Sequence, residues 1–238
     1  MRHGIRGTDL PYAFPAVRRR KRFDEHIKTN IGFTAALRIG SGAKAADGNG
    51  EYFMVYVFLA EGFEEIEALT PVDLLRRAGA EVRTVGVGSK NITGAHGITV
   101  ACDMSEDEAS ASIKEAPEAL EMTVLPGGMP GTLNLGKSET VSHFLDAAAE
   151  CGAFIGAICA APSVLGAKGL LRGRRAVCYP GFEDKLTGAK IENAGVVRDG
   201  NIICARAAGS AVEFALCLIS ALKGERAAEE VRHAIIAQ

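Results

Sequence analysis

The chain has 238 residues, of which 47% are hydrophobic and 24% charged, and its formal net charge at pH 7 is -2. This length and composition predict one large globular domain or two small ones, and they exclude a chain that is disordered throughout. The small net charge, built from both signs, gives no field that would gather nucleic acid or an anionic membrane around the folded part. Small molecules and other proteins are therefore the expected partners.

Cysteine usage and hydrophobic runs predict a soluble, cytoplasmic protein. The six cysteines stand mostly inside apolar strand or helix patterns, without the spacing of a disulfide framework or a zinc site, so we interpret them as reduced thiols. No apolar run reaches the roughly 18 residues that a membrane span requires. Five cysteines are interpreted as small apolar fillers: Cys102, Cys151, Cys178, Cys204 and Cys217.

Residues 1–53 differ from the rest of the chain. They carry a basic run at residues 18–22 and glycine-rich loop signals, and they show no sustained hydrophobic period. Acidic residues and the lack of an apolar core argue against a transit or secretory peptide. We expect a disordered extension or an over-extended start, with Met54 as the natural beginning; a basic tail that touches nucleic acid is the alternative.

Residues 54–238 are predicted to form a single domain, in which strands and helices alternate with short connections. This pattern is typical of an α/β sandwich with a mostly parallel central sheet. Strands are predicted at residues 54–60, 81–87, 121–125, 154–158 and 175–179, with two short pieces within 91–101 and a strand pair within 196–206. Helices are predicted at residues 64–78, 138–149, 160–167, 210–222 and 227–237, and an acidic loop between residues 101 and 121.

Cys159 stands where an apolar strand turns within a residue or two into a helix of small residues. This corner exposes the thiol and aims the unpaired N–H groups of the next helix at it, as in a nucleophile elbow. A positive helix end lowers a thiol pKa, so we expect Cys159 to be partly thiolate near neutral pH. Because ligands gather at the carboxyl ends of parallel strands, the elbow is expected to meet the loops at residues 61–67 and 126–128 in one pocket.

Several motifs, in this order along the chain, resemble the ThiJ/PfpI superfamily, and within it the DJ-one branch of parkinsonism-associated deglycases with its bacterial relatives. The resemblance covers the chain from Met54 to about the C-terminus. It implies a flavodoxin-like three-layer α/β sandwich with a cysteine nucleophile elbow. The matching segments are residues 61–67, 71–73, 76–79, 125–128, 157–162 and 213–216.

Carried over to this chain, the resemblance makes Cys159 the nucleophile and Glu67 the glutamate that hydrogen-bonds it. A carboxyl that faces a thiolate in a confined pocket has its pKa raised by desolvation and by the like charge, so it can stay protonated and act as general acid and base. Without the resemblance, spacing alone favours a solvated helix glutamate at this position. The N–H groups of Gly127, Gly128 and Ala160 are candidates to bind an oxyanion or a cysteine oxide.

The resemblance also points to His96, Arg206 and Tyr179 as pocket residues. His96 stands where several relatives carry arginine, and it is expected to reach across a dimer interface; otherwise it is an exposed loop histidine. Tyr179 stands where this branch often has a histidine, and Ala160 follows the nucleophile where protease-like members need a histidine base. Peptidase chemistry is therefore disfavoured, and catalysis is expected to rest on Cys159 and Glu67.

What the resemblance implies is a cysteine-dependent enzyme, glyoxalase III-like or deglycase-like, that acts on α-oxoaldehydes or their protein and nucleotide adducts. The reaction needs no cofactor, and no metal-ligand set is visible in the sequence. The alternative is a non-enzymatic redox sensor or chaperone that works through oxidation of Cys159. The expected partners are a small carbonyl substrate and a second copy of the chain in a homodimer, without nucleic acid at the folded domain and without a membrane.

Overall fold

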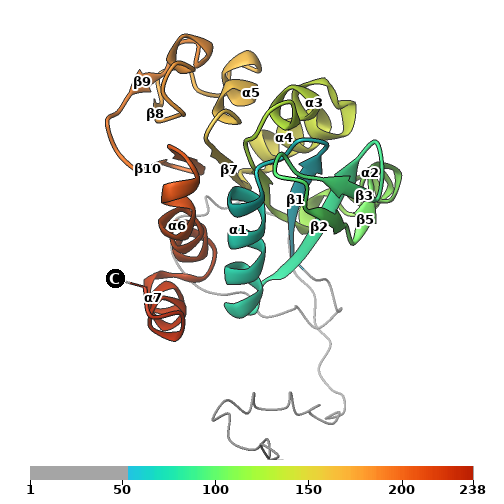
Figure 1. Ribbon diagram of the computed structural model, residues 1–238, viewed down its shortest axis with the longest axis horizontal. Helices are drawn as coiled ribbons and strands as arrows, with labels where there is room; N and C mark the ends of the chain where they lie inside the picture. The colour runs from blue at the N-terminus through green and yellow to red at the C-terminus, as the bar shows by residue number, and fades with distance from the viewer. Residues whose placement is uncertain (1–52, 238) are drawn as a thin grey trace, which may run out of the picture. The chain divides into compact units, whose positions relative to one another are not determined.

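Seven strands form the central sheet of this protein, in a computed structural model that describes residues 53–237 (Figure 1). The expectation for residues 1–53 therefore falls almost wholly outside the described residues. The strands run in the order β10-β11-β7-β6-β1-β2-β5, and all neighbours are parallel except β10 and β11. The strands of this sheet are β1 (Met54–Ala60), β2 (Glu81–Val87), β5 (Met104–Ser105), β6 (Leu120–Leu125), β7 (Phe154–Ile158), β10 (Val196–Asp199) and β11 (Ile202–Ala205).

Two small sheets accompany the central one. A hairpin pairs β3 (Asn91–Thr93) with β4 (Thr99–Ala101), which confirms the two short pieces predicted there. A second, parallel pair joins β8 (Arg175–Ala176) to β9 (Lys190–Ile191). The strand predicted at residues 175–179 is thus only two residues long and lies outside the central sheet.

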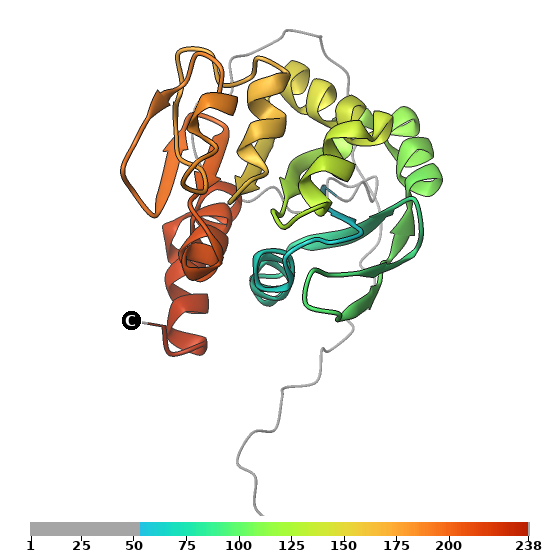
Figure 2. The ribbon, with the colours of Figure 1, turned by 45° about the horizontal axis from the view of Figure 1, so that its top comes forward.

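Helices cover both faces of the central sheet, as Figures 1 and 2 show. The apolar side chains of α1, α6 and α7 share one buried cluster with one face of the strands, and those of α2, α3, α4 and α5 share a second cluster with the other. The result is the three-layer α/β sandwich that was predicted. The helices are α1 (Glu65–Arg77), α2 (Glu106–Glu115), α3 (Gly131–Lys137), α4 (Glu139–Cys151), α5 (Pro162–Ala167), α6 (Ala211–Lys223) and α7 (Glu225–Ala234).

The acidic loop predicted between residues 101 and 121 is wrong, because β5 and α2 occupy most of this stretch. Ser105 and Glu108 form a reciprocal capping box, in which each side chain accepts a hydrogen bond from the other residue's backbone N–H. Ala109 and Ile113 face the core and are buried. The acidic side chains gather in the first turn of α2, where the helix dipole favours them.

None of the described helices is both long and apolar enough to span a membrane. Strand β7 ends at Ile158, and β1 ends at Ala60, so the segments that follow both strands lie at the carboxyl edge of the sheet. Residues 126–128, which follow β6, lie between them because β6 pairs with both strands. The topology therefore brings together the three loops that the sequence singled out.

Candidate active site

Cys159 occupies the corner between β7 and α5 with a φ of 65°, in the left-handed region that a cysteine seldom adopts. Hydrogen bonds on both sides hold this conformation. The Cys159 N–H donates to the carbonyl of Ala205 at 2.9 Å, and the Cys159 carbonyl accepts from the N–H of Tyr179 at 2.8 Å. The half-buried thiol thus projects from a sharp, strained turn, which is the geometry of a nucleophile elbow.

Glu67 faces the thiol from the first turn of α1. Its side chain is almost completely buried, and it shares a hydrogen bond with Cys159. Its Oε2 also accepts the N–H of Gly127 at 2.9 Å. A further N–H reaches the carboxyl from Ala208. Desolvation by burial raises the pKa of Glu67 to about 7, and the negative charge of Glu64 adds to this, while the hydrogen bonds oppose it.

The predicted lowering of the Cys159 pKa is wrong. Burial, the negative charge of Glu67 and the hydrogen bond to Glu67 raise the pKa of the thiol to about 12. The N–H groups of Ala160 and Gly128 act on the sulfur in the opposite direction, but they are outweighed. The helix contributes little, because α5 is only six residues long and begins three residues after Cys159, at Pro162.

The two groups therefore titrate as a pair. The pair gives up its first proton at about pH 7, and the second proton is held to about pH 12, because the first charge opposes the formation of another one. Between these limits the pair keeps one proton, which the higher pKa places on the Cys159 sulfur, and Glu67 is a carboxylate facing the thiol. The thiolate forms when this proton passes to Glu67.

Glycines at residues 127 and 128 make this approach possible. A Cβ at Gly127 would lie 2.5 Å from Oε2 of Glu67 and 2.7 Å from Cβ of Cys159, so no other residue fits between them. Gly128 has a φ of 90°. Two of the three predicted N–H donors, those of Gly128 and Ala160, point at the sulfur. The third, at Gly127, is taken by Glu67 instead.

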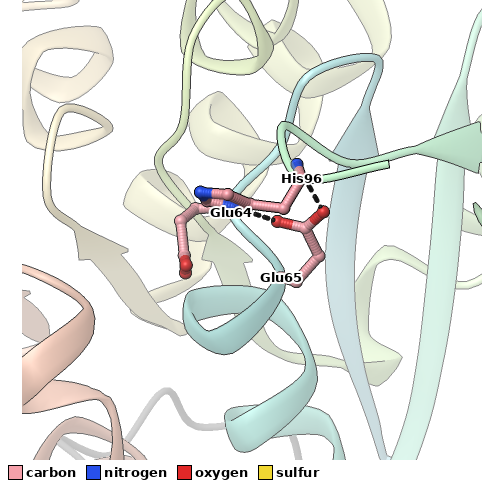
Figure 3. Close-up of side chains that lie close together, drawn as sticks. All are labelled: Glu64, Glu65 and His96. Atoms are coloured by element: carbon pink, nitrogen blue, oxygen red, sulfur yellow. Dashed lines mark hydrogen bonds and ion pairs between the residues drawn. The ribbon is translucent and has the colours of Figure 1, made fainter. Parts of the chain in front are cut away.

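His96 does not join the Cys159–Glu67 pair but binds Glu65 of its own chain (Figure 3). Glu65 is buried at the start of α1, and its carboxylate accepts from the His96 backbone N–H at 2.7 Å and meets Nδ1 at 2.8 Å. The hydrogen bond and charge of Glu65 raise the pKa of His96. Although burial opposes it, the hydrogen bonds from His96 lower the pKa of Glu65. The imidazole itself is largely exposed on the β3–β4 turn.

Among residues 53–237, Glu64, Glu65 and His96 form one group whose ligand atoms lie close enough to hold a metal ion, within 4.8 Å of one another. Hydrogen bonds account for their arrangement. Glu65 is engaged by His96, and Glu64 caps α1 by accepting the N–H of Glu67 at 2.7 Å. We assign no metal to this group.

Tyr179 contacts the elbow through its backbone, and Arg206 directly follows Ala205, which accepts the Cys159 N–H. Arg206 directly follows β11, which pairs with β7, and its guanidinium donates to Oδ1 of Asn193. Burial raises the pKa of the Cys178 thiol, and the positive charge of Arg206 opposes this rise. The Tyr179 N–H donates to the Cys159 carbonyl, and the Tyr179 side chain is about half-exposed.

A hollow of about 300 Å³ at the same sheet edge is lined by other residues: Glu61, Val87, Gly88, Glu106, Asn134, Lys137 and Ser138.

The remaining thiols only partly match the filler interpretation. Cys102, Cys178 and Cys204 are buried, and burial raises the pKa of each. Cys217 is half-buried. Cys151 is exposed, because it ends α4 where the helix leaves the core, so for this residue the interpretation is wrong.

The fold and this site define an α/β protein that carries a cysteine at a nucleophile elbow, with a buried glutamate facing the cysteine. The sequence pattern of the DJ-1/PfpI family matches residues 54–221, and the chain belongs to this family. The DJ-one branch predicted from the motifs is thereby confirmed.

Three relatives illustrate the similarity. The chain is 35% identical over 184 residues to the Parkinson disease protein 7 homolog of Danio rerio, covering 76% of this chain and 95% of the relative. It is 32% identical over 166 residues to the glutathione-independent glyoxalase DJR-1.2 of Caenorhabditis elegans, covering 69% and 85%. The structure of oxidized Toxoplasma gondii DJ-1 superposes with a TM-score of 0.71 at 33% identity, covering 77% of this chain and 98% of the other.

Proposed function

We propose that this chain is a cysteine-dependent stress-response enzyme that converts α-oxoaldehydes such as methylglyoxal to hydroxy acids. The observation that carries the proposal is the hydrogen bond between Cys159 and the buried Glu67 carboxyl, which places a nucleophile and a general base at one point. Membership of the DJ-1/PfpI family and the glyoxalase named among the relatives support it.

The reaction begins as the Glu67 carboxylate takes the proton of the Cys159 thiol. The sulfur adds to the aldehyde carbon of methylglyoxal, and Glu67 passes that proton to the aldehyde oxygen, which forms a hemithioacetal. The N–H groups of Gly128 and Ala160 point at the sulfur and stabilise the negative charge that it carries after Glu67 has taken its proton.

The Glu67 carboxylate then acts as the base. It removes the hydrogen from the former aldehyde carbon as a proton and returns a proton to the neighbouring carbonyl carbon, while the hydroxyl proton passes to the neighbouring carbonyl oxygen and a thioester forms. Water hydrolyses the thioester, releasing lactate and the Cys159 thiol. Hydrogen moves from one substrate carbon to the next, so the conversion of methylglyoxal and water to lactate balances without an external oxidant.

Lactate formation from methylglyoxal, followed by NMR, tests the proposal. We expect turnover by the native chain, none above background for Cys159→Ala, and a loss of about 100-fold or more for Glu67→Gln, the usual scale of general acid–base catalysis. Cys151→Ser removes an exposed thiol that precedes β7, at the opposite end of this strand from Cys159, and is expected to leave turnover unchanged. Absence of native turnover, or equal turnover after Cys159→Ala, would refute the enzymatic proposal.

A glycated peptide offered in parallel distinguishes the deglycase-like form of the same chemistry. Repair of the hemithioacetal or aminocarbinol adduct, with release of lactate, would extend the substrate class from free aldehydes to adducts. The same two variants, Cys159→Ala and Glu67→Gln, are expected to abolish it.

The second candidate function is redox sensing through Cys159. The N–H groups of Gly128 and Ala160 and the nearby Glu67 carboxyl could hold a sulfinate, and one similar structure is that of an oxidized DJ-1 protein. Intact-mass spectrometry after mild peroxide is expected to show a gain of two oxygens at Cys159. The exposed Cys151 competes for oxidant, so Cys151→Ser is the proper background. Oxidation spread evenly over the thiols would contradict this function.

We also propose that the chain acts as a homodimer. Three large apolar side chains, Ile66, Ile98 and Met129, are each about half-exposed around the start of α1. The Ile98 N–H lies 3.5 Å from Oε1 of Glu65, and the backbone at Met129 packs against Gly62. Exposed apolar side chains gathered in this way are typical of an interaction surface.

A further inference from the structure

The hollow of about 300 Å³ at the carboxyl edge of the sheet is lined by neither Cys159 nor Glu67. Its walls come from the segments that follow β1 and β2, the first turn of α2, the second half of α3 and the N-cap of α4. These three helices lie on the same face of the sheet (Figure 1). A hollow of this volume is at the lower end of the range of small-molecule sites, so it has room for one small ligand.

Glu106 fixes the walls of this hollow. Its Oε2 accepts the N–H of Gly88 at 2.8 Å, and its Oε1 accepts the hydroxyl of Ser138 at 2.5 Å. The carboxylate thereby joins the end of β2, the start of α2 and the N-cap of α4. Because both of its oxygens are engaged, Glu106 shapes the hollow and gives it negative charge without requiring a further partner.

Three other polar groups of the lining are not satisfied in this way. The Thr93 N–H donates to Oε1 of Glu61 at 3.1 Å, and no described residue donates to Oε2. The Asn134 amide donates to the Glu61 carbonyl at 3.0 Å, which leaves its Oδ1 as an acceptor. Lys137 forms no ion pair and no side-chain hydrogen bond within residues 53–237, although two carboxylates line the same hollow. The hollow thus combines two oxygen acceptors with a separate ammonium group.

We propose that this hollow binds a small α-amino acid as its zwitterion. The ammonium group of the ligand donates to Oε2 of Glu61 and Oδ1 of Asn134, and its carboxylate accepts from the Lys137 ammonium. A small apolar side chain contacts Val87, the half-buried apolar residue of the lining. The inference is independent of the proposed function, because it uses neither member of the reactive pair.

Charge complementarity favours this class of ligand over simpler ones. An amine alone leaves Lys137 without an anion and places two cations in one small hollow. A carboxylic acid alone pairs with Lys137 but brings its negative charge next to Glu61 and Glu106. A divalent cation needs about six oxygen ligands and is repelled by the lysine. A ligand that carries both charges satisfies all three groups, which is how a binding site rejects its competitors.

Binding of L-alanine to the full chain, followed by ¹H–¹⁵N correlation NMR, tests the inference. We expect saturable shifts of the backbone amide signals of Gly88, Asn134 and Lys137, with a Kd of about 1 mM, on the scale of very small ligands. Ethylamine and acetate each carry one of the two charged groups, and each should bind about ten-fold more weakly or worse.

Two variants test the two charged contacts separately. Lys137→Met removes the ammonium and keeps an unbranched stem, whereas Glu61→Gln removes the charge and keeps an oxygen for the Thr93 N–H. Each should raise the Kd for L-alanine about ten-fold or more, because a charge-assisted contact is lost. Lys190→Met removes another exposed lysine, on β9, and should leave the Kd unchanged.

The absence of saturable shifts with L-alanine, or shifts centred on other residues, would overturn the inference. Equally tight binding of ethylamine or acetate, or an unchanged Kd in either Lys137→Met or Glu61→Gln, would also overturn it. Because the titration needs no turnover, absence of lactate formation would refute the proposed function without affecting this result.

Discussion

At the scale of single residues, the site depends on two groups, one backbone and one side chain, that are held in energetically unfavourable states. Cys159 is held at a φ of 65°, and Glu67 is buried as a titratable carboxyl. A strained backbone of this kind costs of the order of 1–3 kcal/mol and persists only where surrounding hydrogen bonds fix it. Here Ala205 and Tyr179 provide those bonds. The strain keeps the thiol at the corner, where a substrate can reach it.

Replacing Gly127 with alanine is expected to separate the reactive pair. The new Cβ would lie under 3 Å from both Oε2 of Glu67 and Cβ of Cys159, so one of them must move. We predict a loss of about 100-fold or more in lactate formation, because small displacements of catalytic groups have effects of this size. The control is Gly136→Ala, where the new Cβ would make an ordinary contact at 3.6 Å with Val164. Equal activity of Gly127→Ala and Gly136→Ala would contradict the close packing described.

Glu67→Gln is expected to stabilise the protein at alkaline pH while lowering turnover by about 100-fold or more. The carboxyl has a pKa of about 7 when folded and an ordinary value of 4.5, so the folded state binds more protons than the unfolded state between these pH values. Its stability therefore falls as pH rises through that range, by up to about 3 kcal/mol. A neutral amide avoids this cost. Urea unfolding at pH 8 should show Glu67→Gln to be more stable than the native chain. A Glu67→Gln variant that is less stable than the native chain at pH 8 would argue against this prediction.

Sequence motifs identify Cys159 and Glu67, but they do not show which atoms engage them. The N–H of Ala208 reaches Glu67, and no sequence signal could have found it, since every residue except proline carries such a group. The thiol pKa was predicted in the wrong direction for a related reason. The burial of Cys159 and the charge of Glu67 are tertiary effects, and they outweigh the local effect of a helix end.

At the scale of secondary structure, the buried strands are the most predictable elements. The predicted strands at residues 54–60, 81–87 and 154–158 match β1, β2 and β7, because continuous apolar runs leave few alternatives to a buried strand. The carboxyl ends of β1, β6 and β7 then carry the three loops of the site. In contrast, α3 was not predicted, since its glycines at both Gly131 and Gly136 obscure the helical pattern.

The missed helix α2 supplies a prediction at this scale. Its capping box at Ser105 and Glu108 was present in the sequence, but the surrounding acidic residues suggested a loop. Ser105→Ala removes the side-chain acceptor for the Glu108 N–H and is expected to cost about 1 kcal/mol of unfolding free energy. Ser105→Thr retains the hydroxyl and should lose only a fraction of that. Urea titrations measure both, and identical midpoints for Ser105→Ala and the native chain would show that the cap contributes nothing.

At the scale of the whole molecule, the predicted α/β class and mostly parallel sheet are confirmed, whereas the division at residues 53 and 54 stays a prediction. The proposed homodimer belongs to this scale too, since it depends on a surface assembled from separate segments. Ile66 comes from α1 and Ile98 from the β3–β4 turn, and Glu65 brings the two segments together.

Light scattering coupled to gel filtration checks the dimer. We expect the mass of two chains for the native protein and of one chain for the double variant Ile66→Glu, Ile98→Glu, because buried charges disfavour an apolar interface. Ile191→Glu alters another exposed apolar side chain, on β9, and should leave the dimer intact. A native chain that elutes as a monomer at all concentrations would refute the dimer proposal.

The coupling of the Cys159 thiol to the Glu67 carboxylate is the central claim, and thiolate absorbance near 240 nm across a pH titration tests it most directly. A Cys159→Ser reference is subtracted so that only this thiol contributes. For the native chain we predict no thiolate step at about pH 7, where Glu67 titrates, and thiolate only towards pH 12. For Glu67→Gln we predict no step at pH 7 and a single step below pH 12, because the charge that holds the second proton is gone. A single ordinary thiol titration, identical in both proteins, would contradict the claim.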